Sequence, residues 1–401
     1  MMDFGLSEEQ KMLQAEVRKF CAREIAPIVR KIEDGRMIPE EIIKGLADLG
    51  LLAMTAGSRY GGMEADPVTA GLVGEELARA DISCAIPTFF LVEATWGFIF
   101  DKYGSEATKQ EILPLVTEGK AYLGIAVTEP DSGSDIANMK TRAHRTEMGY
   151  EVTGKKTYIS GVREVIDQMP GGGGHLTLVK TDPGKGTRGM SLFYIPVRKE
   201  KGMSITILDD WGRKGISLGG FAMDNVSIPE RYLLGEENKG FYMIMEGFDL
   251  ARGIISLVSC GAAMSALEKA IEYMKMRIAF DRPLARFEGI QFKLAEHWAK
   301  LDAIRTLAYK ALWMYGKAQT EKRFSRFEVT RACAEAKMLA PAAAFEAIND
   351  AIQWFGAFGY TTECPLEMAL KGVRSYFWAE GALEIMKVIV ARELLGKDFI
   401  L

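Results

Sequence analysis

The chain has 401 residues and a formal net charge of −4, with 48% hydrophobic and 26% charged residues. This length holds two or three domains or one large multilayer unit, and the composition is that of a soluble globular protein. Because 54 acidic residues outnumber 50 basic ones, no overall positive field exists to attract nucleic acid or an anionic membrane.

The chain enters an acidic segment at residues 7–10 without a basic and apolar leader, and no run of about 18 uncharged apolar residues follows. We therefore expect a cytoplasmic protein without membrane insertion. The five cysteines form no Cys-x-x-Cys pair, and the three histidines have no metal-ligand neighbour at i+3 or i+4. We expect no disulfide and no metal site, which leaves a carboxylate or a cofactor to carry any catalysis.

The first third of the chain has a helical period throughout. Ser7 followed by Gln10 is typical of a helix N-cap, and Pro39 is placed to open a second helix. We expect an all-helical N-terminal domain over residues 1–121, with further helices at 67–80, 89–103 and 106–117.

From Tyr122 the pattern changes to short period-two runs separated by Gly and Pro, which is typical of antiparallel sheet. We expect a β-sandwich or barrel domain over residues 122–236. The run Gly171–Gly174 predicts a flexible surface loop. The expected strands are 141–144, 150–153, 176–179, 191–196, 205–208 and 221–228.

After Gly240 the helical period returns, with an apolar stripe over 294–312 and an alanine-rich run over 329–356. We expect a four-helix-bundle-like domain over residues 237–401. The order of helices, sheet and helices places the chain in the α+β class.

The segment 122–135 joins the first helices to the predicted sheet. An apolar run ends at Val127, and Thr128-Glu-Pro-Asp-Ser-Gly-Ser-Asp135 then supplies hydroxyls, carboxylates and a glycine, which suits a ligand-binding strand end. Taken alone, the segment is equally compatible with an ordinary Ser/Gly/Asp turn.

Several segments in the same order resemble motifs of the acyl-CoA dehydrogenase family, flavoenzymes that oxidise the α,β carbon–carbon bond of CoA thioesters. Residues 128–135 resemble TEPxxGSD, and 380–381 resemble the Glu-Gly pair of YEGT. The likeness covers nearly the full length through further matches at 59–62 (YGG), 154–160 (GxKxWIT), 224–235 (FxxVxVPxxxxLG), 248–252 (the substrate-side loop), 277–295 (RxxFGxPLxxxQxxQFKLAD) and 353–360 (QxxGGxGY).

Glu380 is the candidate general base. No basic residue is nearer in sequence than Arg374 or Lys387, and apolar surroundings raise the pKa of a carboxyl toward the range of a base that works near neutral pH. The alternative is a capping or first-turn Glu of a helix over 382–395. The resemblance implies that Glu380 removes the α-proton while the β-hydride passes to flavin N5.

The resemblance implies FAD as the cofactor, with Ser160 near flavin N5 and Tyr158 beside the ring, in place of the usual Thr and Trp. It also implies that Arg277 pairs with the pyrophosphate of a neighbouring subunit's FAD, although Arg277 is equally compatible with a solvated helix residue. Glu288 and Ala382 replace a usual Gln and Thr, so the strength of FAD binding stays open. The implied cofactor residues are Ile125, Val127, Thr128, Gly133, Ser134, Tyr158, Ile159, Ser160, Arg277, Phe280, Glu288, Gln353, Gly356, Ala357, Ala382 and Glu384.

For the thioester, Asp249 and Arg252 match positions that contact the CoA arm, and they are equally compatible with an i, i+3 ion pair worth ~0.5 kcal/mol. Ala379 stands where the family commonly has a bulky residue, which opens space beside the substrate α-carbon. The implied substrate residues are Ser134, Phe248, Asp249, Arg252, Ala379 and Gly381.

The space at Ala379 favours an alicyclic acyl-CoA of the cyclohexane or cyclohexene carboxyl type. Short branched-chain or straight-chain acyl-CoA is the alternative, and α,β and 1,4 dehydrogenation both stay open. An oxygen-using oxidase or monooxygenase of the same fold and a non-catalytic CoA- or flavin-binding paralogue are the rivals. The resemblance further implies a homo-oligomer, a tetramer or a dimer, and an electron-transferring flavoprotein as acceptor.

Overall fold

A computed structural model describes residues 5–396 and 399. Its first part is helical, as predicted, and the capping box of Ser7 and Gln10 is formed. The helices expected at 67–80 and 106–117 are confirmed with these bounds, whereas the one expected at 89 begins four residues earlier. The N-terminal helices are α1 (Glu8–Phe20), α2 (Val29–Gly35), α3 (Glu40–Asp48), α4 (Pro67–Ala80), α5 (Ala85–Tyr103) and α6 (Glu106–Thr117).

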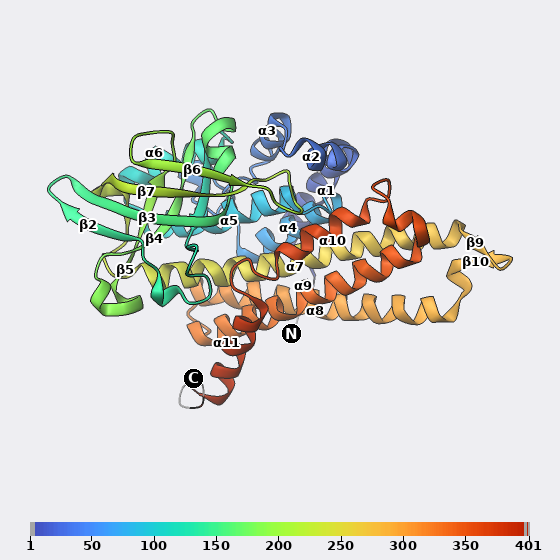
Figure 1. The fold of residues 1–401 in the computed structure, drawn as a ribbon. Coiled ribbons are helices and arrows are strands. Elements are labelled where there is room, and N and C mark those ends of the chain that lie inside the picture. The colour runs from blue at the N-terminus through green and yellow to red at the C-terminus, as the bar shows by residue number, and fades with distance from the viewer. Residues whose placement is uncertain (1–4, 397–398, 400–401) are drawn as a thin grey trace.

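The middle of the chain forms one eight-stranded sheet at one end of the molecule (Figure 1). The strand order is β6-β7-β3-β2-β4-β5-β8, with β1 paired to β4. Most pairs are antiparallel, as predicted, but β1 and β2 both run parallel to β4. The strands are β1 (Tyr122–Ala126), β2 (Arg142–Thr146), β3 (Gly149–Ser160), β4 (Gly173–Lys180), β5 (Met190–Pro196), β6 (Met203–Leu208), β7 (Leu218–Pro229) and β8 (Leu233–Leu234).

The prediction of a flexible loop over the four consecutive glycines is wrong for the last two. Gly173 and Gly174 begin β4 and pair with β1 on one side, and Gly174 also pairs with β5. A Cβ on Gly173 would lie 2.1 Å from the carbonyl oxygen of Tyr122. These glycines are thus required for a close approach between strands, not for loop flexibility.

The C-terminal part is a helical bundle, as predicted, and it packs against the N-terminal helices. α7 is apolar enough to cross a membrane, but its apolar window is fully buried, as in the core helix of a soluble protein. A two-stranded finger, β9–β10, projects from the bundle end remote from the sheet (Figure 1). The elements are α7 (Gly240–Met276), β9 (Ile278–Ala279), β10 (Arg282–Pro283), α8 (Glu288–Thr320), α9 (Arg326–Trp354), α10 (Leu366–Ser375) and α11 (Leu383–Leu395).

A buried ion pair fixes the chain where it leaves β1. Lys156 Nζ donates to Val127 O at 2.8 Å and lies 2.9 Å from Glu129 Oε1. The carboxylate of Glu129 also accepts the backbone N–H groups of Lys140 and Thr141. Because the two charged side chains are 0% and 5% exposed, this network holds the backbone of the strand end rigidly.

Replacing Lys156 by Met is expected to cost about 3–5 kcal/mol of unfolding free energy, because the Glu129 carboxylate is left buried without its partner. Urea unfolding followed by circular dichroism measures the loss. The double variant Lys156→Met/Glu129→Leu removes both charges and should recover most of the stability. A double variant no more stable than the single one would show that the backbone bonds of Glu129, not the ion pair, dominate.

The same pair predicts a pH dependence. Burial tends to raise the pKa of Glu129, but Lys156 and the hydrogen bonds from Thr141 and Lys140 hold it below the usual 4.5. A carboxyl with a lowered folded pKa contributes stability above its unfolded pKa and loses this contribution as pH falls through the folded pKa. The difference in unfolding free energy between wild type and Lys156→Met should therefore shrink below about pH 4.5.

Candidate active site

Glu380 lies in a turn between α10 and α11. Its φ angle is 54° and that of Gly381 is 104°, so two successive residues have a left-handed backbone. For a residue with a side chain this conformation costs about 1–2 kcal/mol, and it persists only where the surroundings hold it. The capping alternative is wrong, because Ala382 occupies the N-cap position of α11 and the exposed Glu384 lies in its first turn.

Two buried cations hold this turn by its carbonyl groups. Arg252 Nε donates to Glu380 O at 3.1 Å. Lys337 Nζ donates to Gly381 O at 2.5 Å. Arg252 is itself fixed by Asp249, whose Oδ1 lies 2.7 Å from Nη1, so the i, i+3 ion pair considered from the sequence is present. Both members support the turn that carries Glu380, and a direct CoA contact by either one stays a prediction.

The half-buried carboxylate of Glu380 has a raised pKa. Removal from water raises it above the usual 4.5, and the charges of Lys337, Arg252 and Arg213 oppose the rise. Burial is the main cause that lowers the pKa of Lys337 to about 7, and the positive charge of Arg252 adds to this effect. The expected direction for Glu380 is therefore confirmed. Its surroundings are not only apolar, however, because three segments distant in sequence bring cations to it.

The contacts of Glu380 with the cations use only its carbonyl oxygen. Among the described residues, neither its carboxylate nor its backbone N–H has a hydrogen-bond partner, while its carbonyl oxygen is bound. The turn therefore presents a base and a backbone donor together.

The end of β3 displays Tyr158 and Ser160. The pairing of β3 with β7 shifts register between Thr157 and Ile159, and Tyr158 has a φ angle of 58° with 63% of its surface exposed. Ile159 is buried, so only its backbone is accessible to a ligand. An exposed aromatic ring and a half-buried hydroxyl at one strand end fit a planar cofactor ring.

The end of β1 lies beside β3, because Thr157 N donates to Thr128 O at 3.0 Å. Ile125 and Thr128 are half-buried and Val127 is buried, whereas Gly133 and Ser134 lie in an exposed loop. The structure thus brings the first eight cofactor residues implied by the sequence to one region of the sheet: Ile125, Val127, Thr128, Gly133, Ser134, Tyr158, Ile159 and Ser160.

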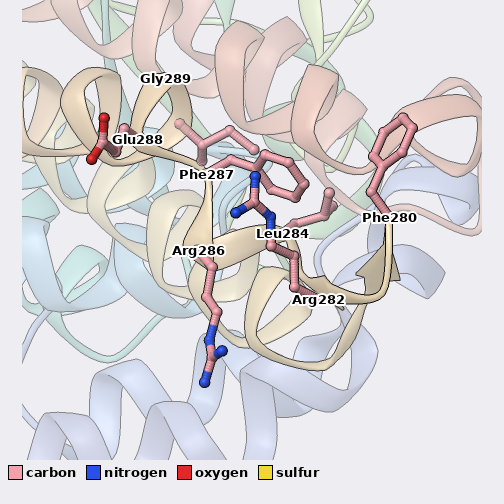
Figure 2. A pocket seen from close by; sticks show the side chains of 8 residues that line it. Phe280, Arg282, Leu284, Arg286, Phe287, Glu288 and Gly289 are labelled. Carbon is pink, nitrogen blue, oxygen red and sulfur yellow. The ribbon is translucent and has the colours of Figure 1, made fainter.

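Six of the remaining cofactor candidates lie at the far end of the bundle, whereas Ala382 and Glu384 lie at the start of α11, next to Glu380 in sequence. Arg277, Phe280 and Glu288 belong to the finger and the start of α8, where a surface hollow of about 640 Å³ opens (Figure 2). The end of α9 joins this region, since Tyr273 stacks on Phe355 with ring centroids 4.3 Å apart. Within one chain these residues stand apart from the sheet (Figure 1). The candidates Gln353, in the last turn of α9, and Gly356 and Ala357, just after this helix, are exposed.

Of the other substrate candidates, Phe248 packs edge-on against Trp96 with ring centroids 5.8 Å apart, and Ala379 is half-buried against the core. Sequence reasoning missed Lys337 and Arg213. The one available signal for Lys337 is a lysine within the alanine-rich stripe of α9, where it is 0% exposed. Arg213 lies in a loop with no periodic pattern, and its sequence neighbours give no sign of its contacts.

The comparisons place the chain in a family. The N-terminal, middle and C-terminal domains of acyl-CoA dehydrogenase match residues 7–120, 124–226 and 238–395. An acyl-CoA dehydrogenase of Bacillus subtilis is 31% identical over 98% of this chain and 99% of its own length. A 3-(aryl)acrylate reductase of Clostridium sporogenes is 30% identical over 97% and 99%. A glutaryl-CoA dehydrogenase solved with glutaryl-CoA has a TM-score of 0.89 at 29% identity, over 98% and 97%.

The chain therefore belongs to the acyl-CoA dehydrogenase family. It is an oxidoreductase that acts on acyl-CoA, and its cofactor is FAD. The residues at the strand ends fit this cofactor, since they combine an exposed aromatic ring with a hydroxyl that has no acceptor among the described residues.

Proposed function

We propose that the chain converts an acyl-CoA thioester to the enoyl-CoA with Glu380 as the base. The observation that supports this proposal is the turn of Glu380, whose carboxylate and N–H have no partner within the described part of the chain while cations fix its carbonyl groups. FAD, when bound, supplies the acceptor for the hydride that leaves the β-carbon.

The α-proton of a thioester is a weak acid, so the site has to stabilise the enolate that forms as Glu380 takes the proton. The free N–H of Glu380 is a suitable donor to the thioester carbonyl, and a donor of this kind is worth about 2.7–4 kcal/mol. The cations Arg252, Lys337 and Arg213 add a positive field around the developing negative charge. Proton removal and charge stabilisation thus come from one turn of the chain.

For the substrate, we propose an acyl group with a ring or branch at the α-carbon, with cyclohexanecarboxyl-CoA and cyclohexenecarboxyl-CoA as first choices. The small half-buried Ala379 next to the base supports this proposal. Flavin bleaching by a panel of CoA esters tests it. A best rate on butyryl- or octanoyl-CoA contradicts the ring substrate, and peroxide formed in step with turnover would favour an oxygen-using enzyme.

The variant Ala379→Tyr is expected to lower kcat/KM for a ring ester about 10–200-fold, the effect of excess bulk in an apolar pocket. Steady-state assays with an artificial acceptor measure this change. Butyryl-CoA in the same assays is the internal control, because a slim chain should lose less than a ring. Equal losses on both esters would show that the tyrosine disturbs the turn, not the pocket.

We also propose that the active protein is a homo-oligomer in which a second copy's finger completes the FAD site. The separation of the two groups of cofactor candidates supports this, as do apolar side chains on and beside the finger: Met276, Ile278 and Phe280 are 73%, 55% and 87% exposed. Light scattering with and without FAD tests it, and a monomer with full FAD content contradicts it. We further propose that an electron-transferring flavoprotein accepts the electrons and that the protein is cytoplasmic.

A further inference from the structure

Arg213 is a buried cation whose charge acts on the carboxylates of Asp210 and Glu380, although it lies in direct ion-pair contact with neither. It lies in the loop between β6 and β7, its φ angle is 51°, and 9% of its surface is exposed. Within residues 5–396 it forms no ion pair, and its one side-chain hydrogen bond runs from Nη1 to Ser160 Oγ at 3.2 Å. Burying a cation without a direct ion pair is costly, which favours a role of Arg213 toward a bound ligand.

The bond from Arg213 determines what the Ser160 hydroxyl can do. A guanidinium only donates, so Ser160 Oγ is the acceptor and its own hydrogen points elsewhere. No described residue accepts that hydrogen. The hydroxyl is therefore left to donate to a ligand.

The backbone of Ser160 is held from the other side of the strand. His175 Nε2 lies 3.1 Å from Ser160 O, and because a carbonyl only accepts, Nε2 carries the hydrogen. His175 is 0% exposed, and burial lowers its pKa to about 4, so the ring is neutral and this tautomer is fixed at neutral pH. Ser160 thus has two supports, one on its carbonyl and one on its hydroxyl.

We propose that Arg213 is a positioning residue that fixes and polarises the Ser160 hydroxyl as a hydrogen-bond donor to N5 of bound FAD. This inference rests on the proposed function, which places Ser160 at N5. A polarised donor at N5 would draw electron density away from the oxidised ring, so Arg213 should make the bound flavin easier to reduce. The charge of Arg213 also acts on Glu380, so one residue influences both the base and the acceptor side of the site.

The test is the midpoint potential of bound FAD, titrated without any acyl-CoA in wild type, Arg213→Met, Ser160→Ala and the double variant. Each single variant should shift the equilibrium about tenfold toward oxidised flavin, which for a two-electron couple is about 29.6 mV more negative. If Arg213 acts through Ser160, the double variant should shift no further than the larger single one. Additive shifts, or an unchanged potential in Arg213→Met, would overturn the inference.

The matched control is Arg305→Met, which removes an arginine paired with Glu75 between α8 and α4, away from the sheet. This control should change the equilibrium between oxidised and reduced flavin by less than about threefold. Arg213→Lys keeps the charge and a donor and should restore most of the shift. If Arg213→Met holds no FAD, Arg213→Gln, which removes the charge but keeps a polar side chain, replaces it and should show the same negative shift. Wild-type protein that binds no FAD, or whose FAD no acyl-CoA reduces, would instead overturn the proposed function.

Discussion

Glu380→Gln is expected to lower kcat/KM for the best CoA ester by about 10²–10⁴, the usual contribution of a general base. The amide cannot take the α-proton. The fold should be retained, because Arg252 and Lys337 hold the turn by backbone carbonyl groups and not by the carboxylate. Steady-state assays with an artificial acceptor measure the loss of kcat/KM. The FAD content of the purified variant reports whether the fold is retained.

The control for this variant is Glu346→Gln, which makes the same chemical change at an exposed position of α9 that pairs with Lys300. It should retain activity within about twofold, since exposed ion pairs contribute about 0–1 kcal/mol. A Glu380→Gln variant with full FAD content and near-normal turnover would show that another group removes the proton.

The raised pKa of Glu380 also predicts the acid limb of the pH profile. Activity needs the ionised carboxylate, so kcat/KM should fall as pH drops through a value above the usual 4.5 of a glutamate. In Glu380→Gln this limb should disappear from the residual activity. An unchanged limb in the variant would assign the titration to a different group.

Local signals predicted most of the helices. The capping box at Ser7 and the bounds 67–80 and 106–117 follow from capping residues, proline and period, which act within a few residues of chain. The run of glycines shows the limit of such signals, because its meaning depends on the carbonyl of Tyr122 some fifty residues away in sequence. Glycine is compatible with both a loop and a close strand contact, and only the pairing decides between them.

The candidate base was predictable because its motif is contiguous, whereas its electrostatic surroundings were not. Arg252, Lys337 and Arg213 come from α7, α9 and the loop before β7, and only the packing of these elements brings their charges to Glu380. A sequence window around Glu380 therefore predicted a raised pKa from desolvation and missed the cations that limit the rise.

Lys337→Met is expected to lower kcat/KM about 10²-fold near pH 7, the scale of a small misplacement of a catalytic group. Two effects combine. Gly381 O loses its donor, which loosens the left-handed turn, and Glu380 loses a neighbouring cation, which raises the pKa of its carboxyl further. Since the ionised form is the active one, the acid limb of kcat/KM should move to higher pH, and part of the activity should return as pH rises.

The charged groups that face Lys337 are Arg252, Glu380 and Glu384, and the lysine is protonated below its pKa of about 7. Lys337→Arg keeps a charge and should move the limb less than Lys337→Met. The matched control is Lys156→Met, the loss of a second buried lysine, which should lower stability without moving the limb. If Lys337→Met reduced activity by one factor at every pH, the lysine would support the turn without setting the ionisation of the base, and the field that reaches Glu380 would come from the two arginines.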